Sequence, residues 1–269
     1  MQESTVWTVV EREEQKLEKL IDTVRSAYGS RAIIGKDEEE FKYAIHGLKE
    51  GKEAGSLYVY AQLIKYKRER SVESFDLQGD KIQTEKTQNP PIVGYSNFIV
   101  FGKYILIEQK GNTLGQRQVL NALLEFYGKN EPSLDLGFMI DTKGLDEFIK
   151  SQERITLVRF SNIVLNPDNP DENIQRFEDI IRDSNSKNTE FSNGGGSGIN
   201  KSSKIIEGGL KLSKMNKLKV KIEAELEGEK QVFNSSKGRN QLKEKVSYEA
   251  SDRDKTVLQK FLDRMKELL

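Results

Sequence analysis

Glu108 and Lys110 are the residues whose spacing first suggests catalysis, because they end a β-rich run as an E-x-K pair. In such a pair a carboxylate can hold Mg²⁺ and the lysine can stabilise developing charge or position water. The site also needs an aspartate, usually on the neighbouring strand. The facing run 94–101 has none, and Asp76 and Asp80 lie far upstream. A metal-dependent nuclease is therefore an alternative, not the leading hypothesis.

The residues that other common catalytic mechanisms require are scarce in or missing from the sequence. The chain has no cysteine and a single histidine, His46, with no acid–base partner nearby in sequence. This excludes thiolate nucleophiles, Cys-ligated metals and His-based metal clusters. Gly195 lies in a glycine-rich stretch that resembles a phosphate loop, but the second glycine is missing before Lys201-Ser202. We expect a protein that binds rather than catalyses, with no cofactor and no metal.

Two basic clusters could contact phosphate backbones. Because formal net charge is zero, nucleic-acid binding requires a segregated basic face. The first cluster follows a tyrosine-rich strand, and the second has seven lysines with Glu207 as its only acid. Such stretches attract nucleic acid by counterion release. The predicted nucleic-acid-binding residues are Lys65, Lys67, Arg68 and Arg70 in the first cluster, and Lys201, Lys204, Lys211, Lys214, Lys217, Lys219 and Lys221 in the second.

The hydropathy pattern argues against a membrane protein. The longest apolar stretch, 98–107, is interrupted by Gly102 and Lys103 and is too short to cross a bilayer. The N-terminus lacks the basic and apolar regions of a signal peptide. We therefore expect a cytoplasmic protein.

The N-terminal half is predicted to mix helices and strands. Helical spacing of apolar residues predicts helices over 11–28 and 37–50, the second of which carries His46. A strand is expected over 56–71, with 79–87 as its partner. Residues 97–101 and 104–109 form a hairpin about the Gly102-Lys103 turn. A helix follows, with Thr113 as its N-cap and Gly128 as its C-terminal stop.

The C-terminal half is predicted to begin with strand 136–141, helix 144–151, strand 155–165 and helix 170–184. A flexible Gly/Ser/Asn loop is expected over 184–203. Strict alternation then predicts a strand over 218–226, with further strands near 228–234 and 243–249. The strands come in runs, which favours an α+β fold with mixed or antiparallel sheets and flanking helices. We expect two domains, 1–152 and 153–269.

The chain ends in an amphipathic helix. Its apolar face is wide enough to pack on its own domain or on another chain. The C-terminal leucine pair favours a partner contact. The predicted partner-binding residues are Phe261, Met265, Leu268 and Leu269.

The order of these features resembles a group of phage-defence proteins that includes RexA of lambdoid phages and KwaB of Kiwa systems. The resemblance lies in the hairpin and the helix that follows it over 96–127, and in the lysine-rich segment and the strands that follow it over 208–246. It implies a DNA-binding or partner-binding component of antiviral immunity. In size and composition the chain also looks similar to archaeal proteins that accompany short prokaryotic Argonautes.

Three hypotheses follow. The first is a non-enzymatic, nucleic-acid-associated subunit of a defence complex, which docks a partner such as Argonaute and helps hold DNA or an RNA–DNA duplex. The second is the nuclease built on Glu108 and Lys110. The third is a protein-interaction scaffold without affinity for nucleic acid.

Overall fold

The computed structural model describes residues 1–12, 17–35, 40–67, 71–76, 81–86, 91–111, 114–128, 131, 133–165, 170–192 and 198–269, with 71–76 and 81–86 described as backbone only. Helices and antiparallel sheets are both present, which confirms the α+β prediction. The chain divides into two compact units. Unit 1 comprises 1–7, 16–133 and 244–269, and unit 2 comprises 8–15 and 134–243.

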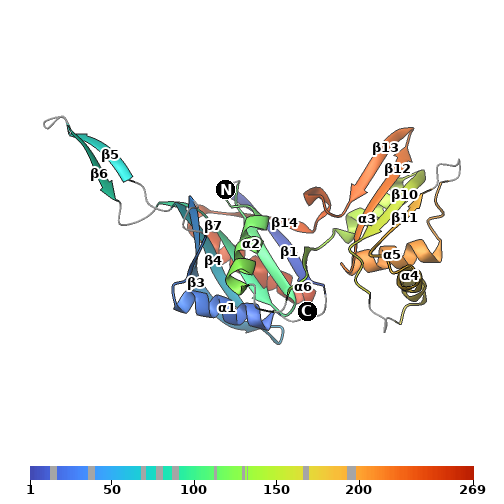
Figure 1. Ribbon diagram of the computed structural model, residues 1–269, viewed down its shortest axis with the longest axis horizontal. Coiled ribbons are helices and arrows are strands. Elements are labelled where there is room, and N and C mark those ends of the chain that lie inside the picture. Colours follow the sequence, from blue (N-terminus) through green and yellow to red (C-terminus); the bar gives the residue numbers. More distant parts are fainter. Residues whose placement is uncertain are drawn as a thin grey trace. The chain divides into compact units, whose positions relative to one another are not determined.

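Unit 1 is built on a large antiparallel sheet whose central strands have alternating or wholly buried side chains (Figure 1). The expected hairpin about Gly102 is confirmed, and this glycine has the positive φ of 48° that the turn requires. Strand β9 (Leu136–Phe138) adds to the unit-2 end of β1. The order is β14 (Lys243–Tyr248), β1 (Gln2–Glu11), β8 (Tyr104–Gln109), β7 (Ile92–Phe101), β4 (Ser56–Lys67), β3 (Phe41–Glu53) and β2 (Ile33–Ile34).

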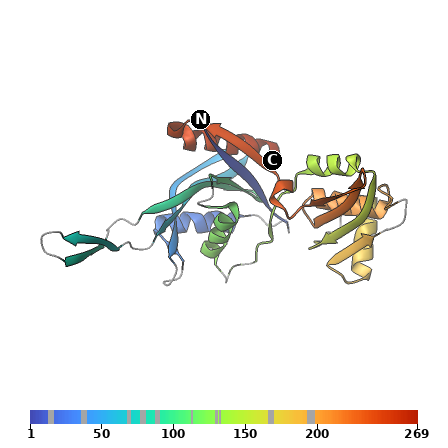
Figure 2. The ribbon, with the colours of Figure 1, turned by 90° about the horizontal axis from the view of Figure 1, so that it is seen from above.

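Helices cover both faces of this sheet. Figure 2 shows α1 (Glu18–Gly29) and α2 (Gln116–Tyr127) on one face and α6 (Arg253–Leu268) on the other. A short 3₁₀ turn, Ala250–Asp252, leads into α6. Because α6 comes from the chain's last segment, the core of unit 1 closes only when the chain returns from unit 2.

Two predictions for the N-terminal half were wrong. The described part of the predicted helix 37–50 is not helical, since β3 occupies Phe41–Glu53 and carries the exposed His46. Strand β3 pairs with β4 along most of its length, and this tertiary pairing overrides a helical spacing that is compatible with both structures. Residues 81–86 form β6, which pairs with β5 (Ser71–Asp76) instead of β4. Residues 2–11 form β1, a strand that was not predicted from the sequence.

The other two helices predicted for the N-terminal half are present in the structure. The first helix begins at Glu18 rather than at residue 11. The helix before Gly128 is confirmed, with Gly115 at its N-cap. Thr113, the predicted N-cap, lies outside the described residues.

Unit 2 contains a four-stranded antiparallel sheet with helices against one face. Its strands are β11 (Asn188–Ser192), β10 (Arg154–Ser161), β12 (Lys219–Leu226) and β13 (Glu229–Asn234), in that order. Helices α3 (Thr142–Ser151), α4 (Glu172–Asp183) and α5 (Lys204–Lys214) share one apolar core with the inward side chains of this sheet. A 3₁₀ turn, Gly238–Asn240, follows β13.

The expected strands over 155–165, 218–226, 228–234 and 243–249 and the helices over 144–151 and 170–184 are confirmed within a few residues. The expected strand 136–141 is present as β9 over Leu136–Phe138, followed by an isolated bridge between Ile140 and Gln241. The predicted loop 184–203 is partly wrong. Its residues 188–192 pair with β10 as an edge strand, and the lysine-rich stretch after it begins with helix α5. The units also differ from the expected division at residue 152, because the chain enters unit 2 at 134 and leaves it at 243.

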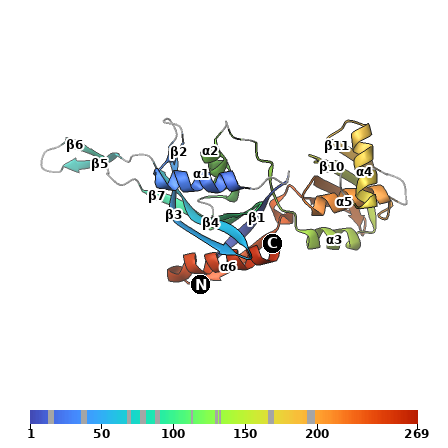
Figure 3. The same ribbon diagram turned by 90° about the horizontal axis from the view of Figure 1, so that it is seen from below.

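Two glycines set the packing of α5. A Cβ on Gly208 would lie 2.0 Å from the backbone oxygen of Asn173 in α4, and a Cβ on Gly209 would lie 2.5 Å from the ring of Phe160. Figure 3 shows α4 and α5 side by side. The glycine pair therefore lets α5 approach both α4 and the sheet more closely than any other residue would allow.

We expect Gly208→Ala to lower the free energy of unfolding by roughly 1–3 kcal/mol, because the added methyl meets rigid backbone. Urea unfolding followed by circular dichroism measures this. Gly29→Ala is the control, since nothing lies within 4 Å of its Cβ position. Equal stability of both variants would contradict the close packing.

Candidate functional site

Glu108 lies at the centre of a buried ionic cluster, not at an open metal site. Its side chain is fully buried, and both of its oxygens accept hydrogen bonds from Arg253, at 3.0 Å from Nε and 2.9 Å from Nη2. The Arg253 guanidinium also lies 4.0 Å from the ring centre of Tyr95. Burial works to lower the pKa of Arg253, but hydrogen bonds and charge from Glu108 outweigh it, so its pKa is raised.

Polar side chains from β4, β7 and α6 extend this cluster. The Asn97 amide donates to Glu108 at 2.8 Å and to Asp254 at 3.2 Å, and its oxygen accepts from Tyr60 at 2.8 Å. Gln62 donates to Asp254 at 2.9 Å. Burial raises the pKa of the Tyr60 hydroxyl, and the charges of Asp254 and Glu108 raise it further, so the phenol remains a donor. The network ties the start of α6 to three strands.

This arrangement argues against the nuclease hypothesis. The carboxylate of Glu108 is already engaged by a guanidinium, so binding a cation would leave Arg253 buried without its partner. Lys110 donates to Gln2 at 2.7 Å, away from Glu108. Among the residues that the structure describes, no three His, Cys, Asp or Glu side chains gather as a metal site would require. Glu108 of the E-x-K run instead forms a structural ion pair with Arg253.

Glu108→Gln is expected to lower the free energy of unfolding by about 3–5 kcal/mol, because it leaves Arg253 as an uncompensated buried charge. Chemical denaturation measures the loss. A double variant, Glu108→Leu with Arg253→Met, is expected to recover part of it because no charge remains buried. If Glu108→Gln were as stable as the parent, the cluster would not be holding α6.

The first predicted basic cluster is only partly described. The ammonium of Lys65 lies 4.2 Å from the ring centre of Phe41, and Lys67 forms an ion pair with Glu40 at 2.5 Å. Arg68 and Arg70 lie outside the described residues. The two described lysines therefore contact groups within unit 1.

Most of the second cluster stabilises unit 2 from within. Lys201 donates to the carbonyls of Ile149 and Gln152, at 3.1 and 2.6 Å, and so satisfies the C-terminal end of α3. Lys217 is 8 % exposed and donates to the carbonyl of Arg12 at 2.5 Å. Neither lysine presents its ammonium group to a ligand, so the nucleic-acid-binding prediction is wrong for these two.

Three further lysines of this cluster lie on α5 and face acids on neighbouring helices. Lys211 pairs with the N-cap Asp171 of α4 at 2.6 Å. Lys204 lies 3.7 Å from Glu172 and Lys214 lies 2.5 Å from Asp146. The acids are distant in sequence, so the apparent excess of positive charge over 201–221 is largely neutralised by the fold.

The last two lysines project from the sheet of unit 2 on the side opposite its helices. We call this side the outer face. The sheet's three phenylalanines, on β10, β11 and β13, belong to the helix-covered core instead, so the outer face carries no aromatic side chain. Its residues, assigned from strand alternation and register, are Arg154, Leu157, Arg159, Ser161, Asn188, Glu190, Ser192, Lys219, Lys221, Glu223, Glu225, Lys230, Val232 and Asn234.

Five cationic side chains and three carboxylates share the outer face, an excess of two positive charges. Arg159 pairs with Glu190, and Arg154 pairs with Glu225. Neither the two arginines nor Lys230 are among the residues predicted from the sequence. The outward positions of the expected strand 155–165 could have indicated Arg159, whereas Lys230 joins the face only through the pairing of β12 with β13.

Glu223 lies at the centre of the outer face and is only 17 % exposed. Its two oxygens accept from Lys221 and Lys230, each at 2.6 Å. Hydrogen bonds from these two lysines, Lys221 first, lower the pKa of Glu223 from 4.5 to about 2. The carboxylate therefore stays ionised in all but strongly acidic solution.

This pKa shift predicts a pH dependence of stability. Because the folded pKa is depressed, the carboxylate stabilises the fold above pH 4.5, and this contribution disappears as the pH falls towards 2. Glu223→Gln is expected to be less stable than the parent at neutral pH, with the difference shrinking through that window. Urea unfolding at several pH values tests this, and a constant difference would contradict it.

Two of the four predicted partner-binding residues belong to the core. Phe261 and Met265 are fully buried under α6, where Phe261 contacts the ring of Tyr60, so the partner-contact prediction is wrong for them. Leu268 packs partly against the same core, and Leu269 is 54 % exposed. Leu269 is thus the predicted contact that remains open to solvent.

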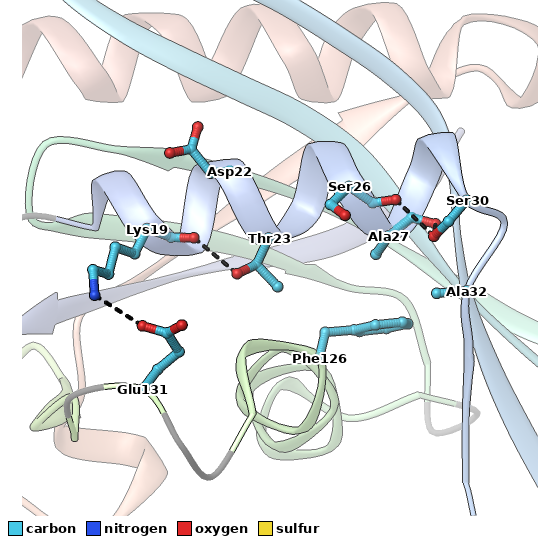
Figure 4. A pocket seen from close by; sticks show the side chains of 9 residues that line it. All are labelled: Lys19, Asp22, Thr23, Ser26, Ala27, Ser30, Ala32, Phe126 and Glu131. Carbon is cyan, nitrogen blue, oxygen red and sulfur yellow. Dashed lines mark hydrogen bonds and ion pairs between the residues drawn. The ribbon is translucent and has the colours of Figure 1, made fainter.

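Unit 1 also has a hollow of about 460 Å³ between α1 and the C-terminal end of α2 (Figure 4). Phe126 lies on one side, and the ion pair of Lys19 with Glu131 spans one end at 2.9 Å. The hydroxyls of Thr23 and Ser30 donate to carbonyls of their own helix. Those donors are therefore already used within α1.

Comparison with known protein families yields no match, and no curated protein matches the chain. Among the described residues, no helix is both long and apolar enough to cross a membrane.

Proposed function

We propose that the chain is a cytoplasmic, non-enzymatic, nucleic-acid-associated subunit that contacts phosphate backbones through the outer face of unit 2. The observation that carries this proposal is the excess of cations over carboxylates on a sheet face that the helices of the unit leave uncovered. Two predicted residues, Lys219 and Lys221, belong to it.

The geometry of the outer face suits backbone contact. Neighbouring strands lie about 4.8 Å apart and successive outward residues of one strand about 6.6 Å apart, so a single nucleic-acid backbone meets several cations at once. Contacts of this kind do not read bases, and they weaken steeply with salt.

The wider role follows from the resemblance to RexA and KwaB proteins. It supports a subunit of a prokaryotic antiviral complex that partners another protein, such as a short Argonaute, and helps hold DNA or an RNA–DNA duplex. Co-purification from the native host tests the partner separately from nucleic-acid binding.

The binding test measures fluorescence anisotropy of a labelled DNA duplex, an RNA–DNA hybrid and each single strand between about 50 and 200 mM salt. We expect affinity to fall with salt. The double variant Lys219→Gln, Lys221→Gln should flatten the logarithmic salt dependence by about 0.9 for each lost duplex contact.

The matched control is Lys204→Gln with Lys211→Gln, which removes the same charge from α5 on the helical side of the sheet. It should leave the salt dependence close to that of the parent. Absence of binding by the parent protein at low salt would refute the proposed function. Equal losses of affinity in both double variants would show that the outer face is not the binding surface.

A further inference from the structure

The ionic arrangement around Glu223 brings two ammonium groups to one carboxylate. Lys221 on β12 and Lys230 on β13 both donate to it at 2.6 Å. The two lysines differ in exposure, at 34 % and 64 %, while Glu223 is far more enclosed at 17 %. The largely enclosed carboxylate of Glu223 thus holds two more exposed ammonium groups at the surface of the sheet.

The other carboxylates of the outer face are engaged differently. Glu190 and Glu225 each face one arginine across a strand pair and are themselves 39 % and 38 % exposed. Among the described residues of this face, Glu223 is the carboxylate whose two oxygens each pair with a different lysine. Its removal would therefore release two lysines from one carboxylate.

A carboxylate that accepts hydrogen bonds from two lysines occupies the same ammonium donors that a phosphate group would use. Both anions present oxygen acceptors to ammonium groups through charge-assisted hydrogen bonds. We propose that Glu223 is an internal competitor for the phosphates of a bound nucleic acid, occupying Lys221 and Lys230 in the free protein and so limiting affinity. This inference rests on the proposed function, and it makes Glu223 the residue that limits the affinity of the outer face for nucleic acid.

The mechanism requires only an exchange of partners. When a backbone approaches, its phosphate oxygens take hydrogen bonds from Lys221 and Lys230, and Glu223 loses part of its ion pairing. Because the lowered pKa keeps Glu223 ionised, it also repels the incoming phosphate. Neutralising this one side chain removes both the competition and the repulsion without changing its shape.

The experiment compares parent protein and Glu223→Gln for binding to the same labelled DNA duplex across a salt series. We expect affinity to rise on the order of tenfold at low salt, because Lys221 and Lys230 no longer leave a carboxylate when they bind phosphates, while binding still weakens as salt rises. Circular dichroism of both proteins verifies that the sheet is intact.

Glu229→Gln is the matched control. Glu229 is exposed at the start of β13 and, among the described residues, is not part of an ion pair. Its replacement by glutamine changes net charge by the same amount as Glu223→Gln. It should raise affinity about twofold at most, through long-range charge alone. Adding Lys221→Gln and Lys230→Gln to Glu223→Gln should abolish the gain.

The outcomes separate the two proposals. Equal affinities for Glu223→Gln and Glu229→Gln, or a gain that survives loss of both lysines, would overturn the inference while the parent's own binding sustains the proposed function. Failure of the parent and of every variant to bind at low salt would overturn both. If Glu223→Gln fails to fold, Glu223→Ser offers the same neutralisation with a smaller polar side chain.

Discussion

The ion pair between Glu108 and Arg253 is the interaction on which unit 1 depends. It joins the last strand of the central hairpin to the first residue of α6, and both side chains are buried. A buried pair of this kind is costly to break, because either partner left alone is an unsatisfied charge in a medium of low polarity. Arg253 also belongs to the segment that returns from unit 2. The pair thus fixes where the chain's last segment lies on the sheet.

Pairing of charged side chains also organises unit 2. A chain with equal numbers of acidic and basic residues can still form basic surfaces, but only where the fold leaves its cations clear of its acids. Helices α4 and α5 bring lysines to acids that are distant in sequence, and Lys201 and Lys217 satisfy backbone carbonyls. The outer face carries five cations and three carboxylates, and there Glu223 pairs with two of the cations.

Local patterns were sufficient for much of the fold. The alternation over 218–226, the Gly102 turn and the apolar stripe of α6 each predicted the element that the structure contains. They failed where a sequence was compatible with two structures. Phe41, Ala44 and Ile45 fit a helical stripe, yet β4 offers a long partner strand, and pairing with it decides the outcome. Residues 188–192 carry little strand signal because Phe191 is their one large apolar side chain, and pairing with β10 at the sheet edge decides their structure.

The sequence by itself determined the composition of any possible site: the lack of cysteine, the single histidine, the supply of lysines and the E-x-K spacing. Tertiary structure alone decided what those residues do. It placed Arg253 on Glu108 across 145 residues, which turned a candidate metal ligand into an ion pair. It also placed Lys230 beside Lys221 on Glu223. Charged side chains act through distances of a few ångströms, and for residues far apart in sequence only the folded chain sets those distances.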